Sequence, residues 1–342
     1  MGAMKELVDA LCSDECAGRA PGTAGGVEAR RRVVQALREA GLSAREQEIA
    51  AGANVIATVP GETDRWVMVA AHYDHLGTEG GDIYRGADDN AAGVAILVEV
   101  ARGLAKEKLR RGLIIAAFDA EEPPHFLEPT MGSREWIRQP TVPLEKLDLM
   151  ICMDVVGHAL GPPGAPDDVR QTILALGAER SVGTAAHVDR LSRAEPGVVV
   201  RRADAEIIPP LSDYEAFWRK EIPFMLLSCA RGRYYHTPQD TPVNLDWAKI
   251  QATARWLERF VRETCERPEQ RIAWRHGVRD DASTLRTVAE MTGLVATLIP
   301  LAAEGETIAR SLLAACGPDG RLPEPKHGQL EMLTDMLEHG LA

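Results

Sequence analysis

Histidine and carboxylate side chains follow the ends of four segments that read as buried strands. His72 follows "WVMVAA", Glu121 and Glu122 follow "LIIAAF", Asp154 follows "LMICM", and His236 lies in the loop after "PFMLLS". In open α/β sheets, functional groups gather at the carboxyl ends of the strands. Asp89 adds another carboxylate from the loop before a predicted helix. The sequence therefore predicts a cluster of acidic and imidazole groups at one edge of a sheet.

These residue types are suited to binding divalent cations. The candidate ligands are His72, Asp89, Glu122, Asp154 and His236. Zinc accepts imidazole nitrogen and carboxylate oxygen, and paired ions about 3.5–4 Å apart recur in hydrolytic sites. The charge of three carboxylates and two neutral imidazoles would be balanced by two divalent cations and one hydroxide. The charge permits two ions without requiring them, since one divalent cation would leave the set at −1; Zn²⁺ would suit these ligands, and so would Mn²⁺ or Co²⁺. Capping of the following helix is the alternative for Asp89.

Asp74 and His75, which follow His72, should lie on opposite sides of the strand. Asp74 lies two residues further on and therefore on the same side, where it could accept the second imidazole N–H. His75 should point to the opposite side, and we expect it to be structural. Asp88 and Asp119 are also expected to be structural.

Five motifs in order along the chain resemble one known family. They are "AAHYDHLG", "GADDNAAG", "FDAEE…MGS", "MDVVGH" and "YYHTPQDT", and the N-terminal "DECAGRAPGTAGGVEARRRVVQALREAGL" resembles the opening helix of the same family. This is the co-catalytic di-zinc aminopeptidase family, metallopeptidase family twenty-eight, and the resemblance covers roughly residues 5–262. It implies hydrolysis of the N-terminal peptide bond of a peptide substrate.

The resemblance also implies a role for each residue. His72 and Asp154 would bind one zinc ion, Glu122 and His236 the other, and Asp89 would bridge both. Asp74 would be the partner of His72. Glu121 would be the general base, because a free carboxylate beside a ligand can take a proton from water and return it to the leaving amine. Tyr235 could donate its hydroxyl to the oxyanion, with a packed aromatic as the alternative.

The substrate pocket is less well defined by the sequence. Residues 123–131, "PPHFLEPTM", are longer than the usual link in the family, and Phe126 and Met131 are candidate pocket walls. Ser212 and Asp213 match a pair near the site in the family, although capping of the helix that follows explains them equally well.

Other functions remain open within the same fold. A carboxypeptidase or dipeptidase would need cations for the substrate carboxylate, and Arg231 and Arg233 could supply them. A glutaminyl cyclase-like acyltransferase would use one zinc ion, and a non-catalytic homologue would lack ligands. The complete ligand set argues against both of these.

Composition narrows the partners. The net charge of −12 over 342 residues argues against nucleic-acid binding, and no stretch reaches the roughly 20 apolar residues of a membrane span. The start lacks the apolar core of a signal peptide and the six cysteines are scattered, which favours a cytoplasmic location, with a removed signal peptide as the alternative.

Strand-like and helix-like segments alternate up to about residue 265, which indicates an α/β fold. We expect a three-layer α/β/α catalytic domain over residues 1–265, with a mixed, mostly parallel sheet at its centre. "NVIATV" and "RWVMVAAH" should form a hairpin joined by "PGETD". Residues 266–342 show only helical patterns, so we expect a helical extension that packs on the main domain, covers the site or forms a homo-oligomer.

Overall fold

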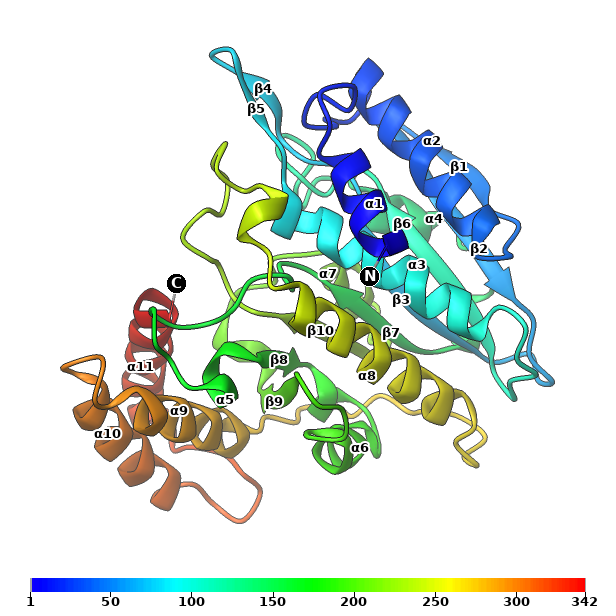
Figure 1. Ribbon diagram of the computed structural model, residues 1–342. Coiled ribbons are helices and arrows are strands. Elements are labelled where there is room, and N and C mark those ends of the chain that lie inside the picture. Colours follow the sequence, from blue (N-terminus) through cyan, green and yellow to red (C-terminus); the bar gives the residue numbers. More distant parts are fainter. Residues whose placement is uncertain (1, 342) are drawn as a thin grey trace.

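An eight-stranded mixed sheet runs through the part of the chain that the computed structural model describes, residues 2–341 (Figure 1). Its strands are β1 (Arg45–Ile49), β2 (Gly52–Val59), β3 (Trp66–His72), β6 (Gly112–Phe118), β7 (Leu147–Met153), β8 (Thr172–Leu176), β9 (Val199–Ala203) and β10 (Phe224–Ser228). Two short strands, β4 (Gly77–Glu79) and β5 (Asp82–Tyr84), form a separate ribbon.

The spatial order of the large sheet is β1-β2-β6-β3-β7-β10-β8-β9, and its central strands β6, β3, β7 and β10 are parallel. These four strands are almost entirely buried, because each is a continuous apolar run that is covered on both faces. Their carboxyl ends consequently meet at one edge. The predicted hairpin between β2 and β3 is wrong: β6 lies between them, and each pairs with β6.

Helices cover both faces of the sheet (Figure 1). One face carries α1 (Gly2–Leu11), α2 (Ala24–Glu39), α3 (Ala92–Leu104), α6 (Thr184–Leu191) and α8 (Trp247–Cys265), and the other carries α4 (Gly132–Arg138) and α7 (Tyr214–Trp218). A short helix, α5 (Asp167–Arg170), precedes β8. Apolar side chains alternate between the two faces, so each face has its own core. The expected three-layer α/β/α fold with a mostly parallel mixed sheet is confirmed.

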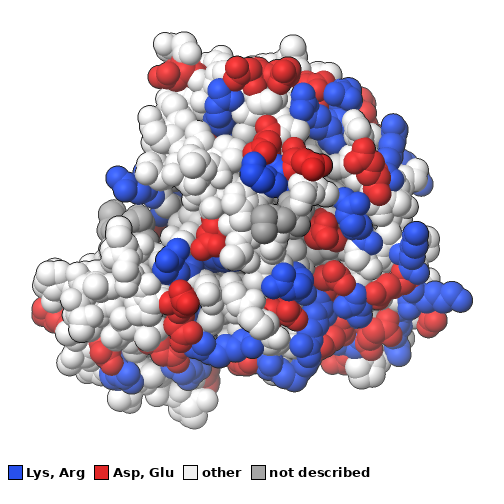
Figure 2. Space-filling model, in the orientation of Figure 1, with Lys and Arg blue, Asp and Glu red and all other residues white. Residues whose placement is uncertain are grey.

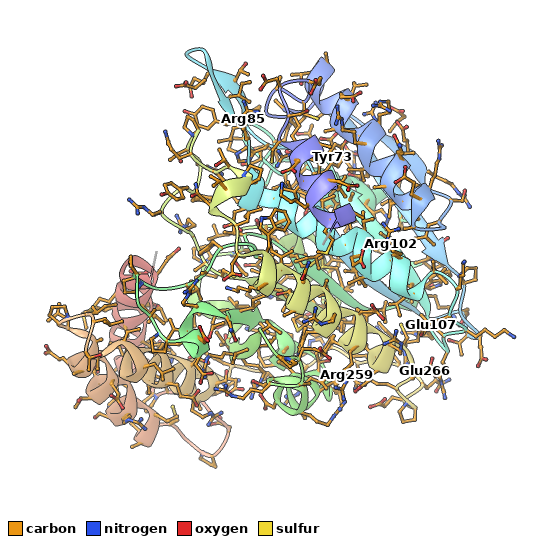
Figure 3. All side chains as sticks on the ribbon, in the orientation of Figure 1. Tyr73, Arg85, Arg102, Glu107, Arg259 and Glu266 are labelled. Carbon is orange, nitrogen blue, oxygen red and sulfur yellow. The ribbon has the colours of Figure 1, made fainter. Side chains whose placement is uncertain are left out.

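A buried arginine connects the N-terminal segment to the loops near the predicted site. Arg19 is fully buried, and its guanidinium donates to the backbone carbonyls of Tyr73 (2.7 Å), Gly86 (2.5 Å) and Asp89 (3.2 Å). Nearby, Arg85 extends back to the end of α1 and donates to the carbonyl of Cys12 (2.5 Å) (Figure 3). The loop that carries Asp89 is thus held by backbone contacts to the start of the chain.

Tyr73, labelled in Figure 3, is a second buried polar anchor. Its hydroxyl lies 2.7 Å from Asp119 Oδ2 and 2.9 Å from the carbonyl of Ala53. Asp119 also accepts the N–H of Ala53 (3.0 Å), so it joins β2 to the segment after β6.

Tyr73→Phe should lower the free energy of unfolding by about 1–3 kcal/mol, because it leaves a buried acceptor without its hydroxyl partner. Chemical denaturation measures the change. Tyr84→Phe, in the half-buried strand β5, is the matched control and should cost less than about 0.5 kcal/mol. Equal stability of the two variants would show that the Tyr73 hydroxyl contributes nothing.

Three further helices follow α8: α9 (Asp281–Val295), α10 (Ala302–Ala314) and α11 (His327–Leu341). They lie together at the end of the sheet beyond β8 and β9 (Figure 1) and share a small apolar core of their own. α9 lies along the edge strand β9. The Thr287 hydroxyl donates to the Arg202 carbonyl (2.7 Å), and the Asp204 N–H donates to the Thr284 hydroxyl (2.9 Å).

Charged side chains of both signs are interspersed on the face shown in Figure 2, where neither sign forms one continuous field. Among the described residues, no helix combines the length and apolar character needed to span a membrane.

Candidate metal centre

The five predicted ligands converge at the carboxyl edge of the parallel strands. His72 is the last residue of β3, Glu122 follows β6, Asp154 follows β7, and His236 lies in the loop after β10. Asp89 comes from a kinked segment, Ala87–Ala91, immediately before α3, in which Asp89 and Asn90 have non-helical backbone angles. Its side chain does not cap that helix. The capping alternative for Asp89 is therefore wrong.

The ligand atoms form two groups that share Asp89. In the first group, His72 Nε2 lies 3.3 Å from Asp89 Oδ1 and 3.4 Å from Asp154 Oδ1. In the second, His236 Nε2 lies 3.1 Å from Asp89 Oδ2 and 3.3 Å from Glu122 Oε2. Each Asp89 oxygen therefore faces a different imidazole, as expected for a bridging carboxylate.

These spacings fit metal coordination better than direct hydrogen bonding. His236 Nε2 is buried and has no hydrogen-bond partner among the described residues. Zinc bonds to nitrogen and oxygen of about 2.0–2.2 Å in a tetrahedral site place neighbouring ligand atoms about 3.3–3.5 Å apart. Both groups come within about 0.3 Å of that separation. The residues present therefore fit zinc at both positions.

Burial governs the electrostatics of this cluster. Asp89, Glu121 and Glu122 are each no more than 5 % exposed. Burial would raise the pKa of Asp89, but His236 and His72 hold that pKa well below its usual value. Burial raises the pKa of Glu121 well above its usual value, against the opposing effect of His72. Among these three carboxylates, Glu121 is thus the one that most readily holds a proton, which suits a group that must take one up and release it.

Asp74 positions the two adjacent glutamates. Its carboxylate accepts the backbone N–H of Glu121 and that of Glu122, each at 3.1 Å. It also faces the imidazole of the first ligand, with Oδ1 3.6 Å from His72 Nδ1. The carboxylate of Asp74 is therefore on the same side of the chain as His72. It contacts the segment after β6 and faces the imidazole at the end of β3.

His75 belongs to the site, and the expectation that it points away is wrong. The strand ends at His72 and the next residues are irregular, so strand alternation no longer decides the direction of His75. Its Nδ1 lies 2.7 Å from Glu122 Oε1. His75, Asp89 and Glu122 are also close enough together to form a ligand group. However, 2.7 Å is a hydrogen-bond distance, shorter than the separation of two ligands on one ion. We therefore interpret His75 as a donor that orients Glu122.

His75→Ala should weaken binding of one zinc ion by about 10–100-fold, because Glu122 Oε1, the oxygen that faces His75, loses its hydrogen-bond donor. Competition with a chelating dye measures the affinity. His75→Asn can still present an N–H and should recover part of the loss. His125→Ala, in which the replaced imidazole lies 2.9 Å from Thr130, is the control. Unchanged zinc affinity in His75→Ala would rule out the orienting interaction.

Of the other residues predicted for the site, three line the cavity beside the metal ligands and two do not. Tyr235 stacks on His236 with ring centroids 3.9 Å apart, and burial, followed by Asp89, raises the pKa of its hydroxyl. The hydroxyl therefore stays protonated and able to donate. Phe126 and Ser212 line the cavity beside the metal ligands. Met131 and Asp213 are buried and do not line it.

The structure also decides the alternatives for the acidic neighbours. Asp213 makes no side-chain capping bond to α7, so the capping alternative is wrong for it. Asp88 accepts the N–H of Gly157 (2.5 Å) and contacts His158 (2.6 Å), which fixes the loop after β7. Asp119 is held by Tyr73 as described above. Asp88 and Asp119 are structural, as expected.

Two cavities meet at the cluster. A cavity of about 440 Å³ is lined by the metal ligands, by apolar residues of β8 and β10 and by residues of α9 and α11. A second cavity, of about 520 Å³, lies on the other side and includes Arg170 and Arg233. Asp89 and Tyr235 line both. The candidate metal centre therefore lies at their junction.

Comparison with known proteins assigns this chain to one family. The model of peptidase family M28 matches residues 54–261, and the chain belongs to that family. Across 217 residues, it is 27% identical to a protein of Escherichia coli K12 named YfbL, described as uncharacterized. That match covers 58% of this chain and 66% of YfbL. The chain spans less than two thirds of the length of this curated relative.

Solved structures support the fold. A glutaminyl cyclase from Porphyromonas gingivalis superposes with a TM-score of 0.61 at 23% identity, covering 77% of this chain and 97% of the cyclase. The LapA aminopeptidase of Legionella pneumophila superposes with a TM-score of 0.61 at 15% identity, covering 78% of this chain and 74% of LapA. Because proteins with two different activities share this fold, the choice between them depends on the residues of the site.

Proposed function

We propose that this chain is a di-zinc aminopeptidase that removes the N-terminal residue of peptides. The observation that carries the proposal is the charge of the 440 Å³ cavity. Among the described residues that line it, six are carboxylates and Arg231 alone is a guanidinium. Arg231 already forms an ion pair with Glu338 (3.0 Å). Three of these carboxylates, Asp89, Glu122 and Asp154, are the proposed zinc ligands, and zinc would offset their charge. The guanidinium of the cavity is already paired, so a free carboxylate of a substrate would find no unpaired guanidinium among the described lining residues, whereas a free ammonium group would meet no repulsion from one.

In this proposal, His72 and Asp154 would hold one zinc ion, Glu122 and His236 would hold the other, and Asp89 would contribute to both sites. Zinc held there supplies Lewis-acid chemistry, lowering the pKa of water and polarising the scissile carbonyl. Two complete ligand groups support two ions over one.

The chain's own residues would then move the protons. Glu121 takes a proton from the attacking water and delivers it to the amine that leaves. The Tyr235 hydroxyl donates a hydrogen bond to the carbonyl oxygen as that oxygen gains negative charge. Asp74 keeps Glu121 and Glu122 in place through their backbone N–H groups.

A second candidate is a dipeptidase or carboxypeptidase, and the second cavity favours it. Arg170 and Arg233 line that cavity and could receive a substrate carboxylate. Arg170 lies 3.9 Å from Asp246, which leaves its pairing loose. A short peptide held at both ends would use both cavities.

Mass spectrometry of peptide digests with added zinc tests the proposal. A peptide with a free N-terminus and an amidated C-terminus should lose its first residue, and N-acetylation should abolish that loss. A requirement for a free C-terminal carboxylate would favour the second candidate. Cyclisation of N-terminal glutamine without release of any residue would instead indicate an acyltransferase.

A further inference from the structure

The first of the two cavities, which is lined by the metal ligands and by α9 and α11, is larger than a small substrate side chain would need. Its volume of about 440 Å³ lies within the range of about 300–1,000 Å³ in which proteins bury whole small ligands. Beyond the metal ligands, most of its lining is apolar and includes Leu174, Leu226 and Ile208, while charged and hydroxyl side chains such as Arg231 and Thr334 make up the rest. These three apolar residues come from β8, β10 and the segment after β9. The cavity can therefore accept a bulky apolar group next to the reacting centre.

The far wall of this cavity is formed by the C-terminal helices. Val288 and Met291 of α9 and Thr334 and Leu337 of α11 line it. The family match ends at residue 261, so this wall lies outside the part of the chain that is shared with the family. The cavity is consequently a composite of family strands and helices beyond the matched segment.

Several contacts hold the wall against the catalytic part. α9 is fixed to β9 by the two threonine hydrogen bonds described above, and the Thr172 hydroxyl lies 3.5 Å from Met291 Sδ. α11 is joined by the Arg231–Glu338 ion pair (3.0 Å) to the loop that carries His236. α11 is thus attached to the loop that carries one metal ligand, and α9 to the outer strands β9 and β8, of which β8 pairs with β10. These contacts fix the position of the wall relative to the reacting centre.

We propose that α9 and α11 form the specificity pocket of this enzyme and that it takes a large apolar N-terminal side chain, aromatic or long aliphatic. This inference rests on the proposed aminopeptidase function. A large apolar side chain would displace water from Leu337, Met291 and the opposing leucines, and apolar burial favours its binding. An alanine side chain would leave most of the same volume to water.

The test compares kcat/KM for phenylalanyl and alanyl amide substrates. Leu337→Trp places a larger side chain in the cavity, and the phenylalanyl-to-alanyl ratio should fall by about tenfold or more. Leu301→Trp is the matched control, because Leu301 is 57 % exposed and does not line the cavity. Its ratio should stay within about twofold of the wild-type ratio. If Leu337→Trp has a lower Tm than the wild type, Thr334→Phe is the second test, because it places a large side chain in the cavity from the same face of α11.

Two negative results have different meanings. A wild-type protein that releases no N-terminal residue from any substrate overturns the proposed function, and the inference with it. The inference alone is overturned if the wild type is active but the phenylalanyl-to-alanyl ratio of kcat/KM is unchanged in a natively folded Leu337→Trp or Thr334→Phe variant. A wild-type preference for alanyl over phenylalanyl substrates would also overturn it.

Discussion

Replacing Glu121 by glutamine should reduce kcat by about 10²- to 10⁴-fold, the usual contribution of a positioned general base. The amide cannot take a proton from water, yet it keeps the size of the carboxylate. Because Glu121 is distinct from the five proposed ligands, the variant should still bind both zinc ions. Steady-state kinetics on an aminoacyl amide and metal analysis of the same sample measure the two effects.

The control for this change is Glu128→Gln, an identical substitution at an exposed position in the same loop. It should retain wild-type kcat and zinc content. Nearly full activity in Glu121→Gln would remove this residue from proton transfer. Loss of zinc from the same variant would instead make Glu121 a ligand, which is a different error in the assignment.

The second large effect concerns the number of metal ions. The wild-type chain should bind two zinc ions, His72→Ala should retain one, and Asp89→Ala should retain less than one, because only Asp89 faces both ligand groups. Elemental analysis after dialysis against zinc-free buffer measures these numbers. Asp82→Ala, at an exposed position in β5, should still bind two.

Zinc should also stabilise the fold, because removing it leaves buried carboxylates close together. A free zinc concentration 100-fold above the dissociation constant of a site contributes about 2.7 kcal/mol. A chelator should therefore lower Tm, and added zinc should restore it. Two zinc ions in Asp89→Ala would refute the bridging assignment. One tightly held ion in the wild type, with cyclisation of N-terminal glutamine, would favour the acyltransferase.

The fold was predictable from the sequence because its central strands are uniform apolar runs. "GLIIAAF" and "LDLMICM" are buried along their whole length as β6 and β7, and each leads directly to a carboxylate. The neighbour relations were less predictable. β2 and β3 are adjacent in sequence but are separated by β6 in the sheet, because pairing depends on the whole sheet and not on the short link between two strands.

The edge strand β9 is not predicted by the apolar pattern, because two adjacent arginines, Arg201 and Arg202, interrupt it. The sequence does not reveal that Arg201 pairs with Glu290 of α9, or that Arg202 pairs with Asp189 (2.7 Å) and Asp280 (2.6 Å). Glu290 and Asp280 are far from the arginines in the chain, and the three carboxylates together let two charges lie in a regular strand.

Some residues of the candidate site could likewise be predicted from local sequence, and others could not. Motifs at strand ends predicted the residues that the structure brings together, because each motif contains its functional side chain. His75 was misjudged because alternation holds only while the strand continues, and β3 ends at His72. The wall from α9 and α11 has no local signal, because contacts such as Arg231–Glu338 join residues far apart in sequence.

The threonine bonds between α9 and β9 have a consequence for solubility. An uncovered edge strand offers free peptide groups to another chain, and such edges promote aggregation. Here Thr287 and Thr284 engage the Arg202 carbonyl and the Asp204 N–H, and the helix covers that side. At the opposite edge, β1 is short and carries charged residues, which is another known protection. The C-terminal helices thus protect the sheet from self-association through its last strand.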